Sequence, residues 1–205
     1  MYKLQMLVIG VALCFLSSCG STKPDIPEGY EMATLGNGCF WCGEAIFQRL
    51  EGVIKVESGF SGGMIPFPTS KVVVKGGTEH AEVVQITFDP KIISYRELLQ
   101  VFFSTHDPTT LNRQGADIGD QYRSVIFYHN DEQEQIAKQV IHEIDSAKIW
   151  DNPVVTQLST YFEFYKAEDR NQNYYNNNSN EPYCRAVINP KLSKLRKEFS
   201  HKLKK

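Results

Sequence analysis

The sequence predicts an α+β fold in which helices and a mixed β-sheet form two layers. Strand-like and helix-like segments alternate along the chain with short connections, and some neighbouring segments are spaced as in hairpins. The length of 205 residues fits one domain with short appendages, and apolar residues make up 41% of the chain. We therefore expect one folded unit with a substantial core.

Turn and capping residues mark where the expected helices begin and end. Asn37-Gly38 precedes a short amphipathic helix, and Gly52 is a natural stop for it. Ser94 and Glu97 form a capping box that begins a second helix, which continues to residue 103. The other expected helices begin at residues 130–131 and span 190–205, and the expected strands are 53–57, 83–88, 122–128, 154–158 and 162–165, with a glycine-rich loop at 59–63.

The last of these helices is basic and amphipathic, with an apolar stripe formed by Leu192, Leu195 and Phe199. Its basic face either contacts anionic lipid or is exposed to water on a helix that packs against the domain. A run of charge is usually a solvated face, so we expect the second arrangement.

The first twenty residues have the layout of an export signal. Lys3 supplies a positive charge, and the apolar run at 7–16 is too short to span a bilayer as a permanent helix. Leu16-Ser-Ser-Cys19-Gly20 then resembles the bacterial lipobox, in which the cysteine is diacylated and becomes the first residue of the mature protein. An ordinary signal peptide cleaved near the same point, or a short membrane anchor, is the alternative.

This pattern predicts an exported bacterial lipoprotein that is anchored to a membrane and faces the periplasm. Residues 1–18 would be the lipoprotein signal peptide, Cys19 the lipidation site and residues 19–30 a lipidated tether. Cys14 would be removed with the signal peptide, and residues 31–205 would form the folded domain.

The overall charge and the number of cysteines exclude some classes of protein. The formal net charge is -2, so nothing favours nucleic acid or an acidic polymer as a partner. Five cysteines are too few for a disulfide-stabilised scaffold in 205 residues. Cys39 and Cys42 form a C-x-x-C pair, whereas Cys184 stands alone near the end of the chain.

Gly36-Asn-Gly-Cys39-Phe40-Trp41-Cys42 is the most informative stretch of the sequence. A cysteine behind two glycines, at the first turn of a helix, lies where unpaired backbone N–H groups and the helix dipole stabilise a thiolate. Phe40 and Trp41 place aromatic faces beside that sulfur, which suits them to hold a small apolar group such as a methyl. Cys42 lies three residues on and faces the same side of the helix, close enough for a disulfide or a shared metal.

Three interpretations of this cysteine pair compete. A structural cysteine beside core aromatics explains Phe40 and Trp41 but not the glycine-flanked helix start. A metal site would need two more thiol or imidazole ligands, and only Cys184 and scattered histidines are available. A redox pair needs nothing further, because an exported compartment permits thiol–disulfide exchange. We therefore expect redox chemistry with no metal and no other cofactor.

A carboxylate on the apolar face of an expected strand is the second feature that indicates a reactive site. Strand alternation places Glu82 on the same face as Val84, Ile86 and Phe88, which is the apolar face. Burial without a cation would raise the pKa of Glu82 and keep it protonated, as a general acid requires. The alternative is that Glu82 lies at the strand end and bends out to water.

These motifs, with a polar loop at 106–124, resemble the A-type peptide-methionine sulfoxide reductases. The matching motifs are Gly-Cys39-Phe-Trp, Gly59-Phe-Ser-Gly-Gly63, His80-Ala-Glu82, His106-Asp-Pro-Thr109, Arg113-Gln-Gly115, Asp117 and Gln121-Tyr-Arg-Ser124. They occur in order between about residues 33 and 197, nearly the whole chain after the signal. The resemblance implies a mixed α/β domain with a ferredoxin-like core. It also implies reduction of the S epimer of methionine sulfoxide, in proteins and as the free amino acid, which repairs oxidative damage.

The resemblance also implies roles for individual residues. Cys39 matches the nucleophile, and Glu82 matches the acid that protonates the sulfoxide oxygen. Tyr122 matches a hydroxyl that hydrogen-bonds this oxygen. The residues that match the substrate pocket are Phe40, Trp41 and Asp117.

One position departs from the family pattern. Relatives commonly have a tyrosine where this chain has Ser70, so a second tyrosine hydroxyl is replaced by a shorter side chain. Tyr122 and Glu82 would then hold the oxygen alone, or a water would fill the gap. The departure bears on the rate and on the pH optimum.

The implied reaction leaves Cys39 as a sulfenic acid, which a second thiol must resolve. Cys184 matches the family's C-terminal resolving region, and Cys42 is the local alternative, at a position where many relatives carry glycine. We favour Cys184, with a relay through both thiols as a third route. Either disulfide would need a thioredoxin-like dithiol donor on the exported side of the membrane, and the substrates would be oxidised proteins.

Two alternatives belong to other classes of protein. A thioredoxin-like disulfide exchanger built on Cys39 and Cys42 would reduce insulin disulfides but ignore methionine sulfoxide. A non-catalytic lipoprotein with structural or zinc-bound cysteines would carry stoichiometric metal and no reactive thiol.

Overall fold

A computed structural model describes residues 26–205 of this chain. The expected signal peptide, Cys14 and the expected lipidation site Cys19 lie outside the described residues, as does most of the expected tether. Within the described range, no helix is both long enough and apolar enough to cross a membrane.

A six-stranded mixed sheet forms the centre of the structure, with strand order β7-β6-β1-β3-β2-β8. All neighbouring strands are antiparallel except β6 and β7, which are parallel. The strands are β1 (Glu31–Asn37), β2 (Val53–Ser61), β3 (Ala81–Phe88), β6 (Ser124–Tyr128), β7 (Gln157–Thr160) and β8 (Phe164–Lys166). A separate hairpin is formed by β4 (Arg113–Gln114) and β5 (Asp117–Ile118).

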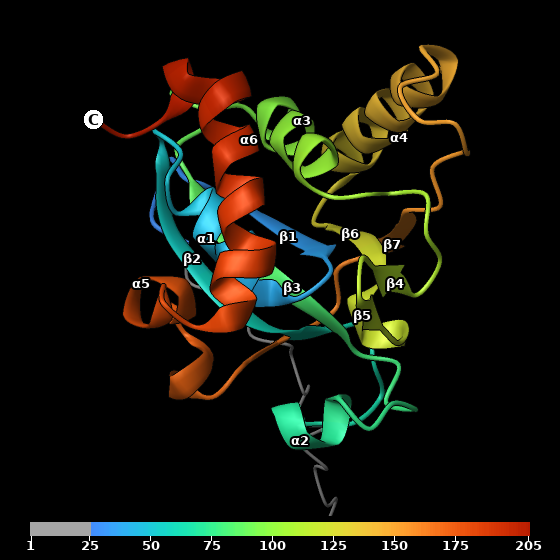
Figure 1. The fold of residues 1–205 in the computed structure, drawn as a ribbon. Helices are drawn as coiled ribbons and strands as arrows, with labels where there is room; N and C mark the ends of the chain where they lie inside the picture. Colours follow the sequence, from blue (N-terminus) through green and yellow to red (C-terminus); the bar gives the residue numbers. More distant parts are fainter. Residues whose placement is uncertain (1–25) are drawn as a thin grey trace, which may run out of the picture.

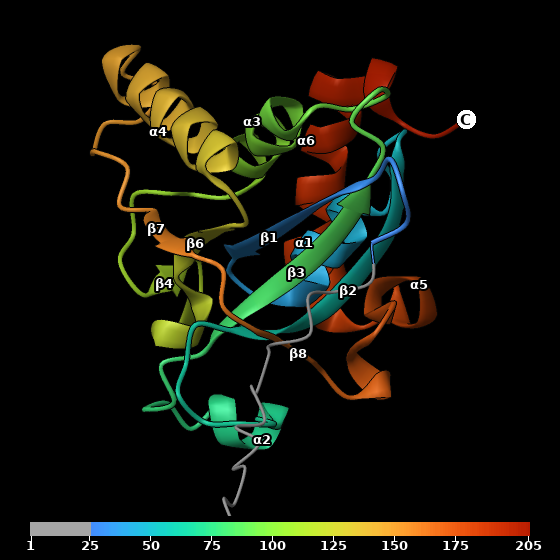
Figure 2. The ribbon, with the colours of Figure 1, turned by 180° about the vertical axis from the view of Figure 1, so that it is seen from behind.

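The major helices cover one face of this sheet, so the fold has two layers (Figures 1 and 2). The helices are α1 (Phe40–Phe47), α2 (Ser70–Val73), α3 (Tyr95–Thr105), α4 (Asp131–Ser146), α5 (Tyr174–Asn178) and α6 (Asn189–Phe199). The chain order β1-α1-β2-β3-α3-β6 combines with the antiparallel order β6-β1-β3-β2, which is a ferredoxin-like arrangement. The expected α+β class and its ferredoxin-like core are therefore confirmed.

The central strand β1 is an element that the sequence pattern did not predict. Its residues Met32 to Asn37 are all buried, those on the helix-covered face and those on the opposite face alike, and β3 and β6 flank it. A strand buried on both faces shows no alternation of apolar and polar residues. Gly36 is required there, since a Cβ would lie 2.7 Å from Val125 Cγ1 and 3.0 Å from the Glu82 carbonyl oxygen.

All five expected strands differ from the expectation in at least one limit, including that expected at 83–88, which begins at Ala81. The strand expected at 53–57 continues to Ser61, so the expected loop at 59–63 begins only at Gly62. Gly59 lies within this strand. Only glycine fits there, because a Cβ would lie 2.4 Å from the ring of Phe164 on β8. The strand expected at 122–128 begins at Ser124, and the last two strands are displaced to 157–160 and 164–166. Pairing with β8 and β6 decides these limits, and pairing is not a local property.

The capping box of α3 is formed as expected. The Ser94 hydroxyl accepts the backbone N–H of Glu97, and the Glu97 carboxylate accepts the backbone N–H of Ser94 at 2.8 Å. We expect Ser94→Ala to lower the free energy of unfolding by about 1 kcal/mol, because the backbone N–H of Glu97 loses the hydroxyl that accepts it. Urea unfolding measures this loss, and Ser94→Asp is the matched control because it restores a cap. Equal stability of Ser94→Ala and the parent would contradict the prediction.

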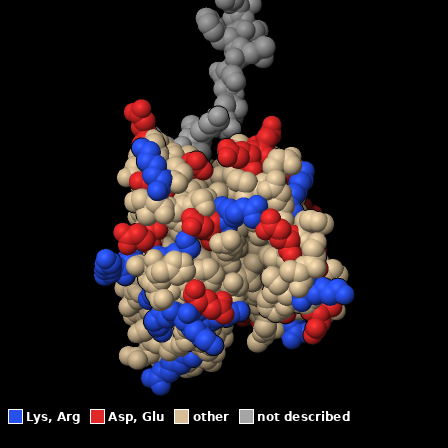
Figure 3. Space-filling view, turned by 90° about the horizontal axis from the view of Figure 1, so that it is seen from above, with Lys and Arg blue, Asp and Glu red and all other residues tan. Residues whose placement is uncertain are grey.

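The last helix, α6, packs against the domain through its apolar stripe. Leu192 and Leu195 are fully buried, and α6 contacts both α1 and α3. The expected docking is confirmed, but α6 ends at Phe199 rather than at residue 205, and Lys191 is an exception to the exposed basic face formed by Lys194, Arg196 and Lys197. Lys and Arg side chains alternate with Asp and Glu over the face of the molecule in Figure 3.

Candidate active site

A cavity of about 430 Å³ collects the residues that the sequence marked for chemistry. It opens at the N-terminal end of α1, between the start of β3, the turn Asp120–Tyr122 and the segment that follows β8. Six expected site residues line it: Cys39, Phe40, Trp41, Glu82, Asp117 and Tyr122.

Cys39 is the N-cap residue of α1 and is 7% exposed. Gly38 before it has φ 94°, and a Cβ there would lie 2.6 Å from Gln114 Cγ, so only glycine fits this position. The backbone N–H of Phe40, in the first turn, donates to Glu82 Oε2 at 3.1 Å. The helix end therefore fixes the carboxyl group of β3 next to the cysteine.

Glu82 points to the helix side of the sheet, as strand alternation predicts. It is 4% exposed, and Val84, Ile86 and Phe88 on the same face belong to the main core. Burial raises the pKa of Glu82 to about 8, against the opposing effect of the Phe40 N–H. The carboxyl group is thus largely protonated at neutral pH, and the alternative of a side chain bent out to water is wrong.

The pKa values of Cys39 and Cys42, at the start of α1, are shifted in opposite directions. Burial raises the pKa of the Cys39 thiol well above its ordinary value, and the hydrogen bond with Cys42 raises it further. The same hydrogen bond lowers the pKa of Cys42 to about 7. The expectation that Cys39 is ionised at rest is therefore wrong. The helix end offers it N–H groups, but the surrounding protein excludes water and Glu82 supplies no positive charge.

Two tyrosines and a tryptophan form the wall of the cavity. The rings of Trp41 and Tyr174 stack with centroids 3.6 Å apart, and Tyr183 meets Trp41 edge-on at 5.8 Å. The indole N–H of Trp41 donates to Asn171 Oδ1 at 3.3 Å. Such a wall binds an apolar group by contact with ring faces and restricts its orientation.

Hydroxyl groups lie at both ends of the cysteine pair. Burial and the neighbouring Glu82 raise the pKa of Tyr122 to about 12, so its hydroxyl remains a donor at physiological pH. The Tyr183 hydroxyl donates to Asp117 Oδ2 at 2.7 Å and lies 3.8 Å from Cys42 Sγ.

Cys184 lies behind this pair rather than in the cavity wall. It is fully buried at the start of a π-helical turn, Cys184–Ile188, that leads into α6. Burial raises the pKa of its thiol, and the nearby Cys42 raises it further. All three cysteines of the described range are free thiols. No three His, Cys, Asp or Glu side chains between residues 26 and 205 are grouped so as to hold a metal ion.

Comparison with known proteins decides the family. A family model described as peptide methionine sulfoxide reductase matches residues 31–203. This chain belongs to that family. The enzyme MsrA of Saccharolobus solfataricus is 55% identical over 174 residues, which is 85% of this chain and 97% of the relative. MsrA of Deinococcus radiodurans is 52% identical over 183 residues, 89% of this chain and 88% of the relative.

Solved structures of the same family share the fold of this reductase. The reduced form of Mxr1 from Saccharomyces cerevisiae has a TM-score of 0.71 at 34% identity and covers 77% of this chain and 91% of its own. Methionine sulfoxide reductase A of Corynebacterium diphtheriae has a TM-score of 0.66 at 33% identity, covering 74% and 76%. The chain is therefore a peptide methionine sulfoxide reductase, an enzyme that reduces methionine sulfoxide and repairs oxidised proteins.

Ser70, the position that departs from the expected family pattern, has a structural role in the reductase. Its hydroxyl donates to Glu168 Oε2 at 2.5 Å and accepts from Asn171 Nδ2 at 2.8 Å. Asn171 in turn accepts the Trp41 indole N–H. Ser70 thus supports the aromatic wall, and its hydroxyl already donates one hydrogen bond and accepts another.

We expect Ser70→Ala to lower kcat by less than about fivefold, since both hydrogen bonds of the hydroxyl support the wall and a loss of about 1 kcal/mol corresponds to that factor. Steady-state kinetics with a methionine sulfoxide peptide measures this. Tyr122→Phe is the comparison and should lose more, because its hydroxyl is not tied into such a network. A loss of roughly a hundredfold in Ser70→Ala would show instead that the serine acts on the sulfoxide.

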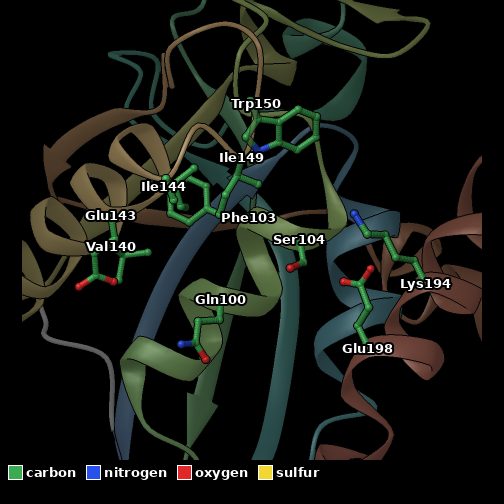
Figure 4. A pocket seen from close by; sticks show the side chains of 11 residues that line it. Gln100, Phe103, Ser104, Val140, Glu143, Ile144, Ile149, Trp150, Lys194 and Glu198 are labelled. Carbon is green, nitrogen blue, oxygen red and sulfur yellow. The ribbon is translucent and has the colours of Figure 1, made fainter.

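A larger cavity of about 460 Å³ lies elsewhere in the reductase, between α3, α4 and α6. Figure 4 shows Phe103, Ile144, Ile149 and Trp150 along one side, with Lys194 and Glu198 opposite. Its lining contains no thiol and no hydroxyl-bearing ring. The chemistry of the reductase therefore belongs to the smaller cavity.

Five residues of the cavity wall were missed from the sequence: Val74, Arg170, Asn171, Tyr174 and Tyr183. All but Val74 follow β8, more than a hundred positions from Cys39, and only the tertiary fold brings them to α1. The signal available was the aromatic content around Cys184, at Tyr174-Tyr175 and Tyr183. By itself that pattern is also typical of a core segment.

Proposed function

We propose that Cys39 is the nucleophile and Glu82 the proton donor in reduction of the S epimer of methionine sulfoxide. The observation that carries this proposal is the pairing of the two groups at one end of the cavity. The first turn of α1 binds Glu82 Oε2 through the Phe40 N–H while Cys39 caps the same turn. A nucleophilic sulfur and a protonated carboxyl group at one point suit oxygen transfer from a sulfoxide.

The proton balance of this step follows from the raised pKa values of both groups. Glu82 gives its proton to the sulfoxide oxygen and takes the thiol proton of Cys39, so no net charge is created in the buried site. The sulfoxide S–O bond breaks, an S–O bond to Cys39 forms, and the products are methionine and a Cys39 sulfenic acid. The carboxyl group acts as a relay that is protonated before and after the step.

The remaining wall residues orient the substrate in this proposal. Phe40 and Trp41 contact the substrate methyl through their ring faces, and the Tyr122 hydroxyl donates to the sulfoxide oxygen. Asp117 holds the Tyr183 hydroxyl at 2.7 Å and so shapes the side of the cavity near Cys42. An asymmetric arrangement of this kind favours one sulfoxide epimer, because exchanging methyl and oxygen would place a polar atom on the aromatic wall.

An assay on the two separated epimers of a peptide methionine sulfoxide tests the proposed stereochemistry. We expect turnover of the S epimer and at least a hundredfold lower kcat/KM for the R epimer, roughly 3 kcal/mol of discrimination. Free methionine sulfoxide of S configuration is the second substrate to test. Comparable turnover of both epimers would contradict the proposed orientation of the substrate in the cavity, but not the reduction of methionine sulfoxide.

Cys42 is the first resolving thiol in this proposal, ahead of Cys184. Cys42 interacts directly with Cys39, whereas Cys184 is near Cys42, whose charge raises the pKa of the Cys184 thiol. Attack by Cys42 on the sulfenic sulfur forms the S–S bond and releases the oxygen as water, with the proton that Cys42 supplies. The Cys184 thiol then attacks the sulfur of Cys42. This frees the Cys39 thiol and leaves a Cys42–Cys184 disulfide.

Mass spectrometry of unreduced peptides after one equivalent of substrate tests this order. We expect a Cys39–Cys42 disulfide at the earliest times and a Cys42–Cys184 disulfide later. Cys184→Ser should stop at the first disulfide while still releasing one methionine. A Cys39–Cys184 disulfide as the earliest product would contradict the relay and favour direct resolution by the C-terminal cysteine.

A thioredoxin-type dithiol completes the proposed cycle. Mxr1, which shares 27% identity with this chain at a TM-score of 0.51, has been solved in complex with Trx2. The substrates of the cycle are oxidised proteins that carry methionine sulfoxide. Turnover with a thioredoxin and its reductase, compared with dithiothreitol alone, tests the donor class.

We also propose that the protein is a lipoprotein, anchored to a membrane through Cys19 and facing the periplasm. The support is the sequence: a positive start, an apolar run and Leu16-Ser-Ser-Cys19-Gly20. Metabolic labelling with a radioactive fatty acid tests it, because Cys19→Ala should lose the label and the membrane association together. An unlabelled parent protein in the soluble fraction would exclude the anchor.

A further inference from the structure

Lys191 is a buried cation that the proposed mechanism does not use. It lies in the first turn of α6, directly after the π-helical turn that begins with Cys184. Its Nζ is buried and has no hydrogen-bond partner among the described residues. A buried ammonium without an acceptor is costly, so the structure has to provide an anion for it at some stage.

The charge of Lys191 lowers the pKa of two titratable groups, Cys42 on α1 and His106 at the end of α3. The His106 ring lies 2.6 Å from the Phe102 carbonyl oxygen and 2.8 Å from Ser124 Oγ. Burial lowers the pKa of His106 to about 3, so this ring is neutral and supplies no negative charge. Cys42 is the one of the two groups that becomes an anion.

The surroundings of Cys42 include groups of both signs. Lys191 lowers its pKa, as do its hydrogen bonds with Cys39 and Tyr183, whereas burial and Asp117 raise it, and the net value is about 7. The titratable or charged groups near Cys42 are Cys39, Glu82, Asp117, Tyr183, Cys184 and Lys191. Lys191 is the one positive charge in this set of described residues, and it belongs to α6, which packs against α1.

We propose that Lys191 is a positioning residue for the resolving step, in which its ammonium group is the counter-ion of the Cys42 thiolate that attacks the Cys39 sulfenic acid. The inference rests on the proposed function, in which Cys42 resolves first. In the step, the Cys42–Cys39 S–S bond forms and the S–OH bond of Cys39 breaks. The leaving hydroxide takes up the proton that Cys42 gave up, and water departs.

The charge of Lys191 matters because the reactive form of a thiol is the thiolate. With a pKa of about 7, roughly half of Cys42 is ionised at neutral pH. Without the ammonium the pKa rises, and an increase of one unit lowers the thiolate fraction at pH 7 from about one half to about one tenth, roughly fivefold. The oxygen-transfer step involves Cys39 and Glu82 and does not depend on this charge.

A single-turnover experiment on the full enzyme separates the two steps. Reduced protein receives one equivalent of a methionine sulfoxide peptide, is quenched in acid at set times, and is assayed for methionine and for the Cys39–Cys42 disulfide peptide. We expect Lys191→Met to release methionine at the parental rate but to form the disulfide roughly fivefold more slowly at pH 7. The pH at which disulfide formation reaches half its maximal rate should move upward by about one unit.

Two further variants are needed for the interpretation. Lys191→Arg keeps the charge and should restore most of the rate and the parental pH profile. Lys197→Met removes an exposed lysine from the same helix and should leave both steps unchanged. Unfolding midpoints of all variants show whether a change in rate follows from a loss of stability.

The outcomes distinguish failure of the inference from failure of the proposed function. A Lys191→Met enzyme with parental disulfide rate and pH profile overturns the role of Lys191 while the reaction scheme stands. An equal slowing in Lys191→Arg and Lys191→Met also overturns it, because packing rather than charge would then be the cause. If the parent enzyme releases no methionine, or first forms Cys39–Cys184, the proposed function itself fails.

Discussion

Replacing Cys39 with serine is expected to abolish methionine sulfoxide reduction, with a loss on the order of 10³-fold or more in kcat. The serine hydroxyl is a far weaker nucleophile than a thiol, and Glu82 is largely protonated and cannot act as a strong base for it. Serine has nearly the size of cysteine, so the N-terminus of α1 should keep its structure. Turnover with dithiothreitol as the reductant measures the effect without a protein donor.

The other cysteines provide the controls for this experiment. Cys42→Ser and Cys184→Ser should still release one methionine per enzyme in a single turnover, because they act only after oxygen transfer. Substantial turnover by Cys39→Ser would remove the nucleophile assignment. Loss of the first methionine in Cys42→Ser would instead make Cys42, whose pKa is about 7, the attacking thiol.

Replacing Glu82 with glutamine is expected to lower kcat by roughly 10²–10⁴-fold with little change in KM. The amide oxygen can still accept the Phe40 N–H, so the loss is that of the transferable proton. The parent enzyme should also lose activity as the pH rises through about 8, since a carboxyl group with this raised pKa is protonated below that value and ionised above it. Measurement of kcat between pH 6 and 10 tests both statements.

Glu44→Gln is the matched control, because Glu44 is also a buried carboxyl group of α1 whose pKa burial raises. It accepts the backbone N–H of Tyr174 at 3.3 Å and is not part of the cavity lining. This variant should retain the decline of activity through about pH 8. If Glu82→Gln raises KM alone, or retains the same decline, Glu82 is not the proton donor.

Local sequence features predicted the parts of the site that depend on neighbouring residues. Gly38 before Cys39 indicated a helix start, and α1 begins there. Alternation along 82–88 predicted the direction of Glu82, and the strand places it against α1. The Ser94 and Glu97 capping box needed only a spacing of three residues. Such features act over one helical turn or two strand positions, so the order of residues is sufficient.

Strand β1 and the C-terminal wall of the cavity could not be predicted in the same way. β1 has no alternating pattern because both of its faces are buried, a consequence of its place between β3 and β6. Tyr174 and Tyr183 reach Trp41 only after β8 has paired with β2. Contacts between segments so distant in the chain leave no periodic signal in either segment.

By itself, the sequence determined the family, the cysteine and carboxyl group of the site, and the helix end that joins them, because these are encoded by adjacent or regularly spaced residues. The tertiary structure decided which thiol is the more acidic. The helix N-terminus predicted an ionised Cys39, yet burial raises its pKa while contact with Cys39 and the charge of Lys191 lower that of Cys42. Protonation depends on water exclusion and on charges brought from distant segments, and both arise only when the chain has folded.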